Sequence, residues 1–189
     1  MNNTFYFLRH AETKVDKDLP VSEWTLSENG IEQAEELANT DIFADIDIVI
    51  SSDEGKAYQT SKPIAEKLEK EIIRIPELNE IDRDKGAFLE KEKFDETIKF
   101  CLTNLDKSIH NWETASHALE RFSRQIEKLD SKYENVKMLI VSHGCVINLY
   151  FAKILDKLDE AFERWLRNTF CDWGIIKNSE VIEDIVRMR

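Results

Sequence analysis

The stretch TFYFLRHAET, residues 4–13, joins a short apolar segment directly to an arginine and a histidine. Thr4 to Leu8 alternates polar and apolar residues and is rich in aromatic side chains, a pattern that is typical of a β-strand. Arg9 and His10 come immediately after this segment. The first predicted strand therefore ends on two side chains that can carry chemistry.

Further segments along the chain show the same strand character, and helical patterns lie between them. Residues 31–38, for example, carry their apolar side chains on one helical face. Strands that alternate with helices predict an α/β fold of three layers, α/β/α, in which a central, mostly parallel sheet has helices on both faces. Pro63 predicts a kink or a break in the second helix. The predicted strands span residues 4–8, 46–50, 71–75, 136–141, 169–176 and 181–188, the last two as an antiparallel pair, and the predicted helices span 31–38, 56–70, 89–105, 115–129, 146–155 and 159–166.

A chain of 189 residues has the size of one α/β domain. Because no internal repeat, linker or low-complexity segment divides it, we expect a single domain that spans residues 1–189. Residues from about 82 to 112 are rich in Lys and Glu and weakly hydrophobic, with Gly86 as their only glycine. They predict a solvated helical insertion, which is either a cap over a site or a charged outer helix.

The formal net charge of −12 at pH 7 argues against nucleic acid as a partner, because binding to a polyphosphate depends largely on Lys and Arg. No apolar run approaches the roughly 20 residues that a membrane span requires. The N-terminus shows no secretory signal pattern, and three widely spaced cysteines suit reduced thiols. We therefore expect a cytoplasmic protein without a membrane segment, and the sequence leaves a homodimer open.

Three polar segments follow predicted strands and are expected to meet at one edge of the sheet. His10 and His143 each come after a strand, and the carboxyl ends of parallel strands are where open α/β sheets bind ligands. The segment SSDEGKAYQT, residues 51–60, follows a third strand and brings the cation Lys56 to the same edge. Gly144 allows close backbone approach and begins a helix whose free amides favour an anion.

These motifs occur together and in a fixed order. Leu-Arg-His with Glu-Thr follows the first strand, Ser-Ser with a cation and Ala-x-Gln-Thr follows the second, and a Ser-His-Gly comes late in the chain. Together they resemble the histidine phosphatase superfamily, which is also called phosphoglycerate mutase-like. Smaller motifs agree with the resemblance, among them an acidic segment and a glutamate followed by arginine eight residues later. The motifs lie at residues 8–13, 51–60, 77–82, 113–121 and 142–144.

The resemblance implies a phosphomonoester hydrolase that acts on a small phosphorylated metabolite and uses neither a metal ion nor another cofactor. An imidazole nitrogen of His10 attacks phosphorus and forms a phosphohistidine, which splits one slow hydrolysis into two easier transfers. Glu80 protonates the departing oxygen and then activates water, with Asp82 and Glu12 as substitutes. The implied catalytic residues are His10, Glu80, His143 and Arg9, and the implied phosphate-binding residues are Arg9, Lys56, His143, Thr13, Asp16 and Gly144.

Protonation states follow from these roles. Arg9 clamps phosphate oxygens with its planar fork, and a protonated His143 adds a second charged donor. Glu80 must carry a proton while His10 stays neutral, so we expect an acidic to neutral pH optimum. Trp24, in the loop after the nucleophile, is the aromatic residue best placed to touch a leaving group.

The chain departs from the usual family residues at several of these positions. Lys56 stands where the family usually has arginine, so the charge is kept and the bidentate geometry is lost. Asp16 stands where an asparagine usually donates to phosphate, and its carboxylate repels the substrate unless it turns away or pairs with Lys56 or Lys14. Asp53 and Glu54 replace a usual Pro-Leu.

Two other functions remain compatible with the same motifs. A mutase uses the same phosphohistidine but returns the phosphoryl group to a second position of its substrate, and the short chain favours the hydrolase over it. A non-catalytic relative that binds phosphorylated ligands is suggested by the departures at Lys56 and Asp16.

Overall fold

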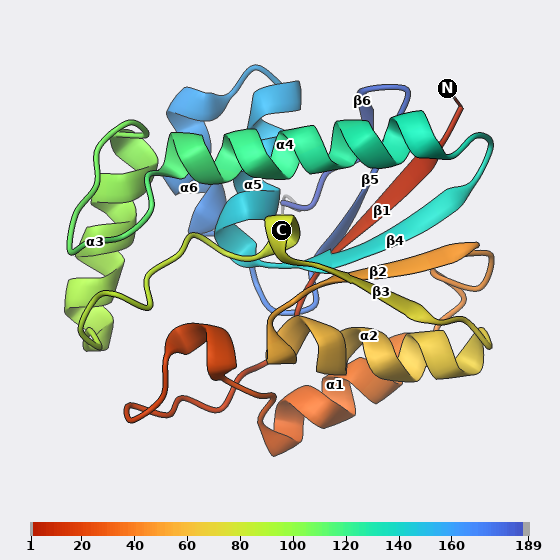
Figure 1. Ribbon diagram of the computed structural model, residues 1–189, viewed down its shortest axis with the longest axis horizontal. Coiled ribbons are helices and arrows are strands. Elements are labelled where there is room, and N and C mark those ends of the chain that lie inside the picture. Colours follow the sequence, from red (N-terminus) through yellow and green to blue (C-terminus); the bar gives the residue numbers. More distant parts are fainter. Residues whose placement is uncertain (1, 187–189) are drawn as a thin grey trace.

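The computed structural model describes residues 2–186 and contains one six-stranded sheet, shown in Figure 1. The strand order across the sheet is β3-β2-β4-β1-β5-β6, so the first strand of the chain lies in the interior of the sheet. The strands are β1 (Thr4–Arg9), β2 (Ile48–Ser52), β3 (Ile72–Ile75), β4 (Lys137–Ser142), β5 (Trp173–Lys177) and β6 (Glu180–Glu183).

The sheet is parallel in its first four positions and antiparallel at one side. β3, β2, β4 and β1 pair in parallel, whereas β5 pairs antiparallel with β1 and β6 antiparallel with β5. This arrangement confirms the mostly parallel sheet and the antiparallel final pair. In the register of β1 and β4, Arg9 lies opposite Ser142, so the residues that follow both strands emerge side by side.

Helices cover both faces of the sheet. Figure 1 shows α1 and α2 on one side of it and α4 and α5 on the other. Phe7 packs in the core cluster with residues of α4 and α5, whereas the adjacent Leu8 packs in the cluster with residues of α1 and α2. No helix within residues 2–186 is long and apolar enough to span a membrane. The α-helices are α1 (Glu28–Ala38), α2 (Gly55–Lys67), α3 (Lys91–Thr103), α4 (Ala115–Lys132), α5 (Gly144–Ile154) and α6 (Ala161–Trp165).

Several predicted elements differ from the structure. The expected break at Pro63 is wrong, because α2 continues through this residue, and buried Ile64 and Ala65 hold that turn of the helix against the sheet. The helix predicted at residues 159–166 is shorter and follows a 3-10 turn at Leu158–Glu160.

The last two strands are also shorter than predicted. The strand predicted from residue 169 begins only at Trp173, because Asp172 accepts hydrogen bonds from the backbone and hydroxyl of Thr169 in a turn. β6 ends at Glu183, and residues 187 and 188 of the predicted strand lie outside the described residues.

The segment from 82 to 112 contains the predicted helix, α3, at the edge of the molecule (Figure 1). It is less solvated than expected, because Ile98, Cys101 and Leu102 on its inner face are buried in the same core cluster as α4 and α5. Phe94 packs partly buried against the same cluster, whereas Lys91, Glu92, Lys93, Glu96 and Lys99 are exposed. The segment is thus packed onto the core through α3, whereas the loop before α3 does not take part in this packing through a helix.

Candidate active site

The two histidines that follow β1 and β4 lie next to each other. Their ring centroids are 5.1 Å apart with an angle of 58° between the ring planes. His10 is 7% exposed and His143 is fully buried. The parallel register of β1 and β4 produces this contact, and we call His10 and His143 the histidine pair.

The one side-chain hydrogen bond of His10 among the described residues determines which ring nitrogen carries the proton. Its Nδ1 lies 2.8 Å from the backbone oxygen of Ala11, and a carbonyl can only accept, so Nδ1 carries the proton and Nε2 has the lone pair. Burial lowers the pKa of His10 well below its usual range, and the nearby charges of His143, Arg9 and Lys56 lower it further. A neutral Nε2 with a lone pair is the state that a nucleophile requires.

Arg9 lies directly on the start of α5. A Cβ atom at Gly144 would come within 3.1 Å of the guanidinium carbon, so the absence of a side chain there makes room for Arg9. Its Nη1 donates to the backbone and side-chain oxygens of Asn168, both at 3.0 Å. Its Nε is buried and has no partner among the described residues. The guanidinium carbon also lies over the ring of Phe170, 4.7 Å from the ring centre.

One ring nitrogen of His143 makes a hydrogen bond, and the other has no hydrogen-bond partner among the described residues. Its Nε2 lies 2.7 Å from the hydroxyl of Ser52, and its buried Nδ1 has no partner within residues 2–186. Burial, followed by the positive charges of Lys56 and Arg83, lowers the pKa of His143 well below its usual range. The expectation of a protonated His143 is therefore wrong for this state of the protein, because its surroundings disfavour a second positive charge.

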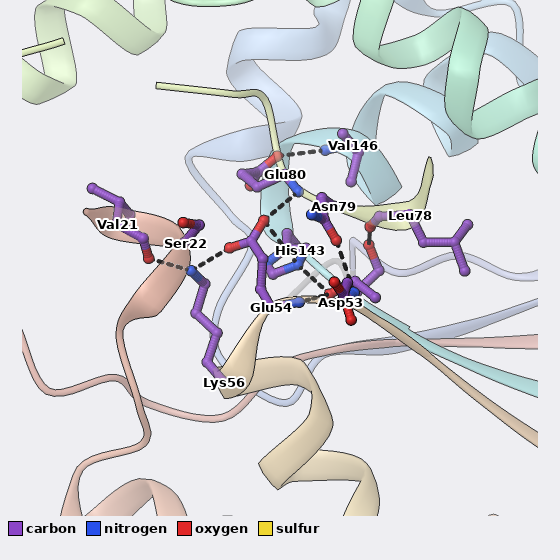
Figure 2. A network of polar contacts seen from close by, with 12 residues as sticks. Val21, Ser22, Asp53, Glu54, Lys56, Leu78, Asn79, Glu80, His143 and Val146 are labelled. Atoms are coloured by element: carbon purple, nitrogen blue, oxygen red, sulfur yellow. Dashed lines mark hydrogen bonds and ion pairs between the residues drawn. The ribbon is translucent and has the colours of Figure 1, made fainter. Parts of the chain in front are cut away.

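Lys56 reaches the site but is already paired. Its Nζ donates to Glu54 Oε2 at 2.5 Å and to the backbone oxygen of Val21 at 2.7 Å, and both members of the ion pair are buried. Glu54 Oε1 accepts from the backbone amide of Glu80 at 2.8 Å and lies 3.4 Å from His143 Nε2. Figure 2 shows Glu54 in the middle of this network.

Sequence reasoning did not identify Glu54 as a site residue. The available signal was that two departures from the family pattern, Glu54 and Lys56, lie two residues apart and have opposite charges. A buried carboxylate requires a partner of opposite charge. The acid at position 54 and the lysine at position 56 therefore explain each other, because each neutralises the charge of the other.

Glu80 reaches the beginning of α5. Its carboxylate accepts from the backbone amides of Cys145 at 2.9 Å and Val146 at 3.2 Å, and also from the amide of Ile81 at 3.0 Å. Free amides at a helix start favour a negative group. Glu80 therefore caps α5 from a loop that is far away in sequence.

A second ion pair fixes the loop that carries Glu80. Arg121 of α4 donates to both carboxylate oxygens of Glu113 at 2.9 and 2.8 Å. It also donates to the backbone oxygens of Glu77, Asn79 and Glu80. The predicted motif of a glutamate followed by an arginine thus holds the loop 77–80 in place.

Thr13 and Asp16 lie in the loop after β1 and make local contacts. The backbone of Thr13 forms a β-bridge with Leu26. The side chain of Asp16 accepts from the backbone amide of Asp18 at 3.0 Å, and Trp24 donates to the Asp16 backbone oxygen at 2.8 Å. Within residues 2–186, neither Thr13 nor Asp16 makes a side-chain hydrogen bond or ion pair with the histidine pair. Asp16 has turned away into its own loop, one of the two outcomes that its carboxylate permits.

A cavity of about 440 Å³ opens beside this network. Glu54 and Glu80 both line it, and so does Arg83, whose guanidinium lies 5.0 Å from the ring centre of Phe94. Among the described residues no group of three or more His, Cys, Asp or Glu side chains is arranged to hold a metal ion. The lining residues are Val21, Ser22, Glu54, Pro76, Asn79, Glu80, Ile81, Asp82, Arg83, Asp84, Lys85, Glu113 and Arg121.

Known proteins are similar to this chain in sequence. A probable phosphoglycerate mutase (GpmB) of Erwinia tasmaniensis is 28% identical over 177 residues, which cover 88% of this chain and 80% of the relative. The adenosylcobalamin/alpha-ribazole phosphatase of Escherichia coli K12 is 24% identical over 184 residues, or 90% of this chain and 88% of that protein.

A solved structure has the same fold. The mycobacterial glucosyl-3-phosphoglycerate phosphatase superposes with a TM-score of 0.77 at 17% identity, covering 93% of this chain and 90% of the other. The family model of the histidine phosphatase superfamily, branch 1, matches residues 5–181, which include both histidines of the pair. The chain therefore belongs to the histidine phosphatase superfamily, with the phosphoglycerate mutase-like α/β fold.

Proposed function

We propose that this protein hydrolyses phosphomonoesters of small metabolites through a phosphohistidine at His10. The observation that carries the proposal is the state of His10: a buried imidazole with a lowered pKa, whose Nδ1 proton is donated to the backbone oxygen of Ala11 and whose Nε2 has no hydrogen-bond partner among residues 2–186. The unpartnered buried donor of Arg9 lies in the same site, where it can bind a phosphate oxygen. Several relatives and structural neighbours are named phosphatases of small phosphorylated metabolites.

The reaction has two steps. In the first, His10 Nε2 forms a bond to phosphorus while the ester oxygen leaves with a proton from a carboxyl group. In the second, water attacks the phosphohistidine and releases inorganic phosphate. Arg9 and His143 stabilise the charge that develops on the phosphoryl oxygens. Glu80 is the acid that the family resemblance implies, and it lines the cavity together with Glu54.

The cellular setting is part of the proposal. The three cysteines are free thiols, two of them buried, which fits a reducing compartment such as the cytoplasm. The positive charge for phosphate binding is supplied by side chains, Arg9 above all, and we propose that the protein works without a metal ion. Thr13 and Asp16 stay candidates for phosphate contact only if their loop moves toward the histidine pair.

The test is hydrolysis of p-nitrophenyl phosphate by wild-type protein and His10→Ala, with His110→Asn as a control at an exposed histidine outside the site. We expect phosphate release by wild type and control and none by His10→Ala. Radiolabelled phosphate trapped on the wild-type chain should be acid-labile and alkali-stable, as expected for a phosphohistidine.

A parallel incubation distinguishes hydrolysis from phosphoryl transfer. Here 3-phosphoglycerate is supplied together with its bisphosphate primer, because some relatives are named as probable phosphoglycerate mutases. Isomer exchange without phosphate release would replace the hydrolase with a mutase, and silence in both assays would leave a phospho-ligand-binding protein.

A further inference from the structure

The turn between α6 and β5 presents an aromatic side chain beside the nucleophile. The backbone amide of Asp172 donates to the backbone oxygen of Thr169 at 3.3 Å and closes a turn with Phe170 and Cys171 at its centre. Turn positions usually hold small or polar residues, whereas the ring of Phe170 is 36% exposed at this one. An exposed phenyl ring gains free energy when an apolar group covers it.

Arg9 holds this turn from both sides. Its Nη1 donates to the backbone and side-chain oxygens of Asn168, which precedes the turn, both at 3.0 Å. Its backbone amide donates to the backbone oxygen of Asp172, the last residue of the turn, at 2.9 Å. The Asp172 carboxylate also accepts from the amide and hydroxyl of Thr169. The ring of Phe170 is therefore fixed relative to Arg9.

Phe170 contacts the two side chains on which the chemistry depends. Its ring centre is 4.7 Å from the guanidinium carbon of Arg9 and 5.7 Å from the ring centre of His10, at 48° between the two rings. His10 is 7% exposed, so the more exposed Phe170 lies between His10 and solvent. Phe170 thus borders the place where a phosphoryl group must bind.

The contact with Phe170 leaves Arg9 able to bind phosphate. A guanidinium group that stacks on an aromatic ring keeps its N–H groups in its own plane, where they can donate to phosphate oxygens. The Nε of Arg9 has no partner among residues 2–186. Arg9 can therefore hold a phosphoryl group while Phe170 remains against it.

We propose that Phe170 is a specificity-determining residue that packs against the organic part of the substrate, so that the protein prefers phosphomonoesters with an apolar or aromatic group next to the phosphate. The inference rests on the proposed hydrolase function. In an in-line transfer the ester oxygen lies across phosphorus from Nε2 of His10, so the organic group extends toward solvent. A ring on the solvent side of His10 and Arg9 is within reach of that group.

The experiment compares benzyl phosphate with ethyl phosphate in wild type, Phe170→Ala, Phe170→Leu and a control. Both esters release alkoxides of similar basicity, so the ratio of their kcat/KM values measures the contact made by the phenyl group. We expect the wild type to favour benzyl phosphate roughly tenfold or more, Phe170→Leu to keep part of this preference, and Phe170→Ala to reduce it to about twofold. The control, Ile182→Ala, changes an exposed apolar residue on β6 and should keep the wild-type ratio.

Two results would overturn the inference. One is a wild type that hydrolyses both esters with equal kcat/KM, which decides the question even where Phe170→Ala fails to fold. The other is an equal loss on both esters in a folded Phe170→Ala, because that pattern means that the ring only supports Arg9 and His10. Thermal unfolding of each variant shows whether it is folded.

Binding of two phosphonates separates this inference from the proposed function. Benzylphosphonate and ethylphosphonate have a carbon–phosphorus bond in place of the ester bond, so they bind without being hydrolysed. Calorimetry should show tighter binding of benzylphosphonate by wild type and loss of this preference in Phe170→Ala. The same result in a protein that hydrolyses no ester would refute the hydrolase and retain the role of Phe170. Equal binding of the two phosphonates by wild type, or binding of neither, would overturn that role.

Discussion

A Cβ atom at Gly144 would come within 3.1 Å of the guanidinium carbon of Arg9. This close approach lets one cation rest on the first turn of α5 while its Nη1 stays bonded to Asn168. The position of Arg9 at the end of β1 thus depends on the absence of a side chain at Gly144, the first residue of α5.

Gly144→Ala should therefore push Arg9 out of place. We expect kcat/KM for p-nitrophenyl phosphate to fall roughly ten- to a hundredfold, because a shift of about 1 Å in a binding group has effects of this size. Gly55→Ala is the matched control, since a Cβ there would meet its nearest atom, the backbone oxygen of Trp24, at an ordinary 3.6 Å. Equal activity in both variants would show that Arg9 tolerates the displacement.

The low pKa values of the histidine pair should make folding sensitive to acid. In the unfolded chain each histidine takes up a proton near about pH 6.5, whereas in the folded state both stay neutral to a much lower pH. Between about pH 6.5 and that lower pH the unfolded chain binds more protons than the folded chain. In this window the free energy of unfolding drops by about 1.4 kcal/mol per pH unit for each histidine. Stability is full above this range and is lost as the pH falls.

Thermal unfolding at pH 7.5 and pH 5.5 measures this effect. Carboxylates contribute to the same slope, so the comparison is with His10→Gln, which cannot titrate. The variant should lose less stability than the wild type over this interval. Parallel curves for the two proteins would mean that His10 titrates normally in the fold.

Arg121→Met should loosen the loop 77–80. It removes a two-bond ion pair to Glu113 and hydrogen bonds to three backbone oxygens of the loop, in a partly buried setting. We expect a loss of about 2–3 kcal/mol in the free energy of unfolding. Arg124→Met breaks an exposed pair with Glu120 and should cost less than about 1 kcal/mol, as measured by urea unfolding.

Removal of metal ions should leave the activity unchanged. In the proposed mechanism the positive charge that binds the phosphoryl group comes from side chains, Arg9 above all, and the described residues contain no cluster suited to a metal ion. Dialysis against EDTA, followed by assay with p-nitrophenyl phosphate, measures this. Activity that disappears and returns with a divalent ion would contradict the proposed mechanism.

The sequence predicted the positions of those site residues that come directly after a strand. His10 and His143 come immediately after β1 and β4, and parallel pairing of these strands is enough to bring them together. The alternation of Phe7 and Leu8 toward opposite faces likewise follows from the geometry of a strand. These features require only local pattern and sheet topology.

The contacts made by loops were not predictable in this way. Glu80 binds the start of α5 across 65 residues, and the Glu80 amide binds Glu54 across 26 residues. Neither pairing has a periodicity in the sequence, since each depends on how the loop 76–82 packs after the sheet has formed. The charge state of His143 was misjudged for a related reason, because burial is a property of the whole fold.

The place of β1 in the sheet divides the molecule into a rigid part and an adaptable part. β1 is hydrogen-bonded to β4 on one edge and β5 on the other, so its amides should exchange with solvent only when the whole domain opens. The loop at 82–85 that lines the cavity belongs to no strand or helix and can open at lower cost. Ligand selection can therefore change by substitution in this loop while the backbone beneath the nucleophile stays unaltered.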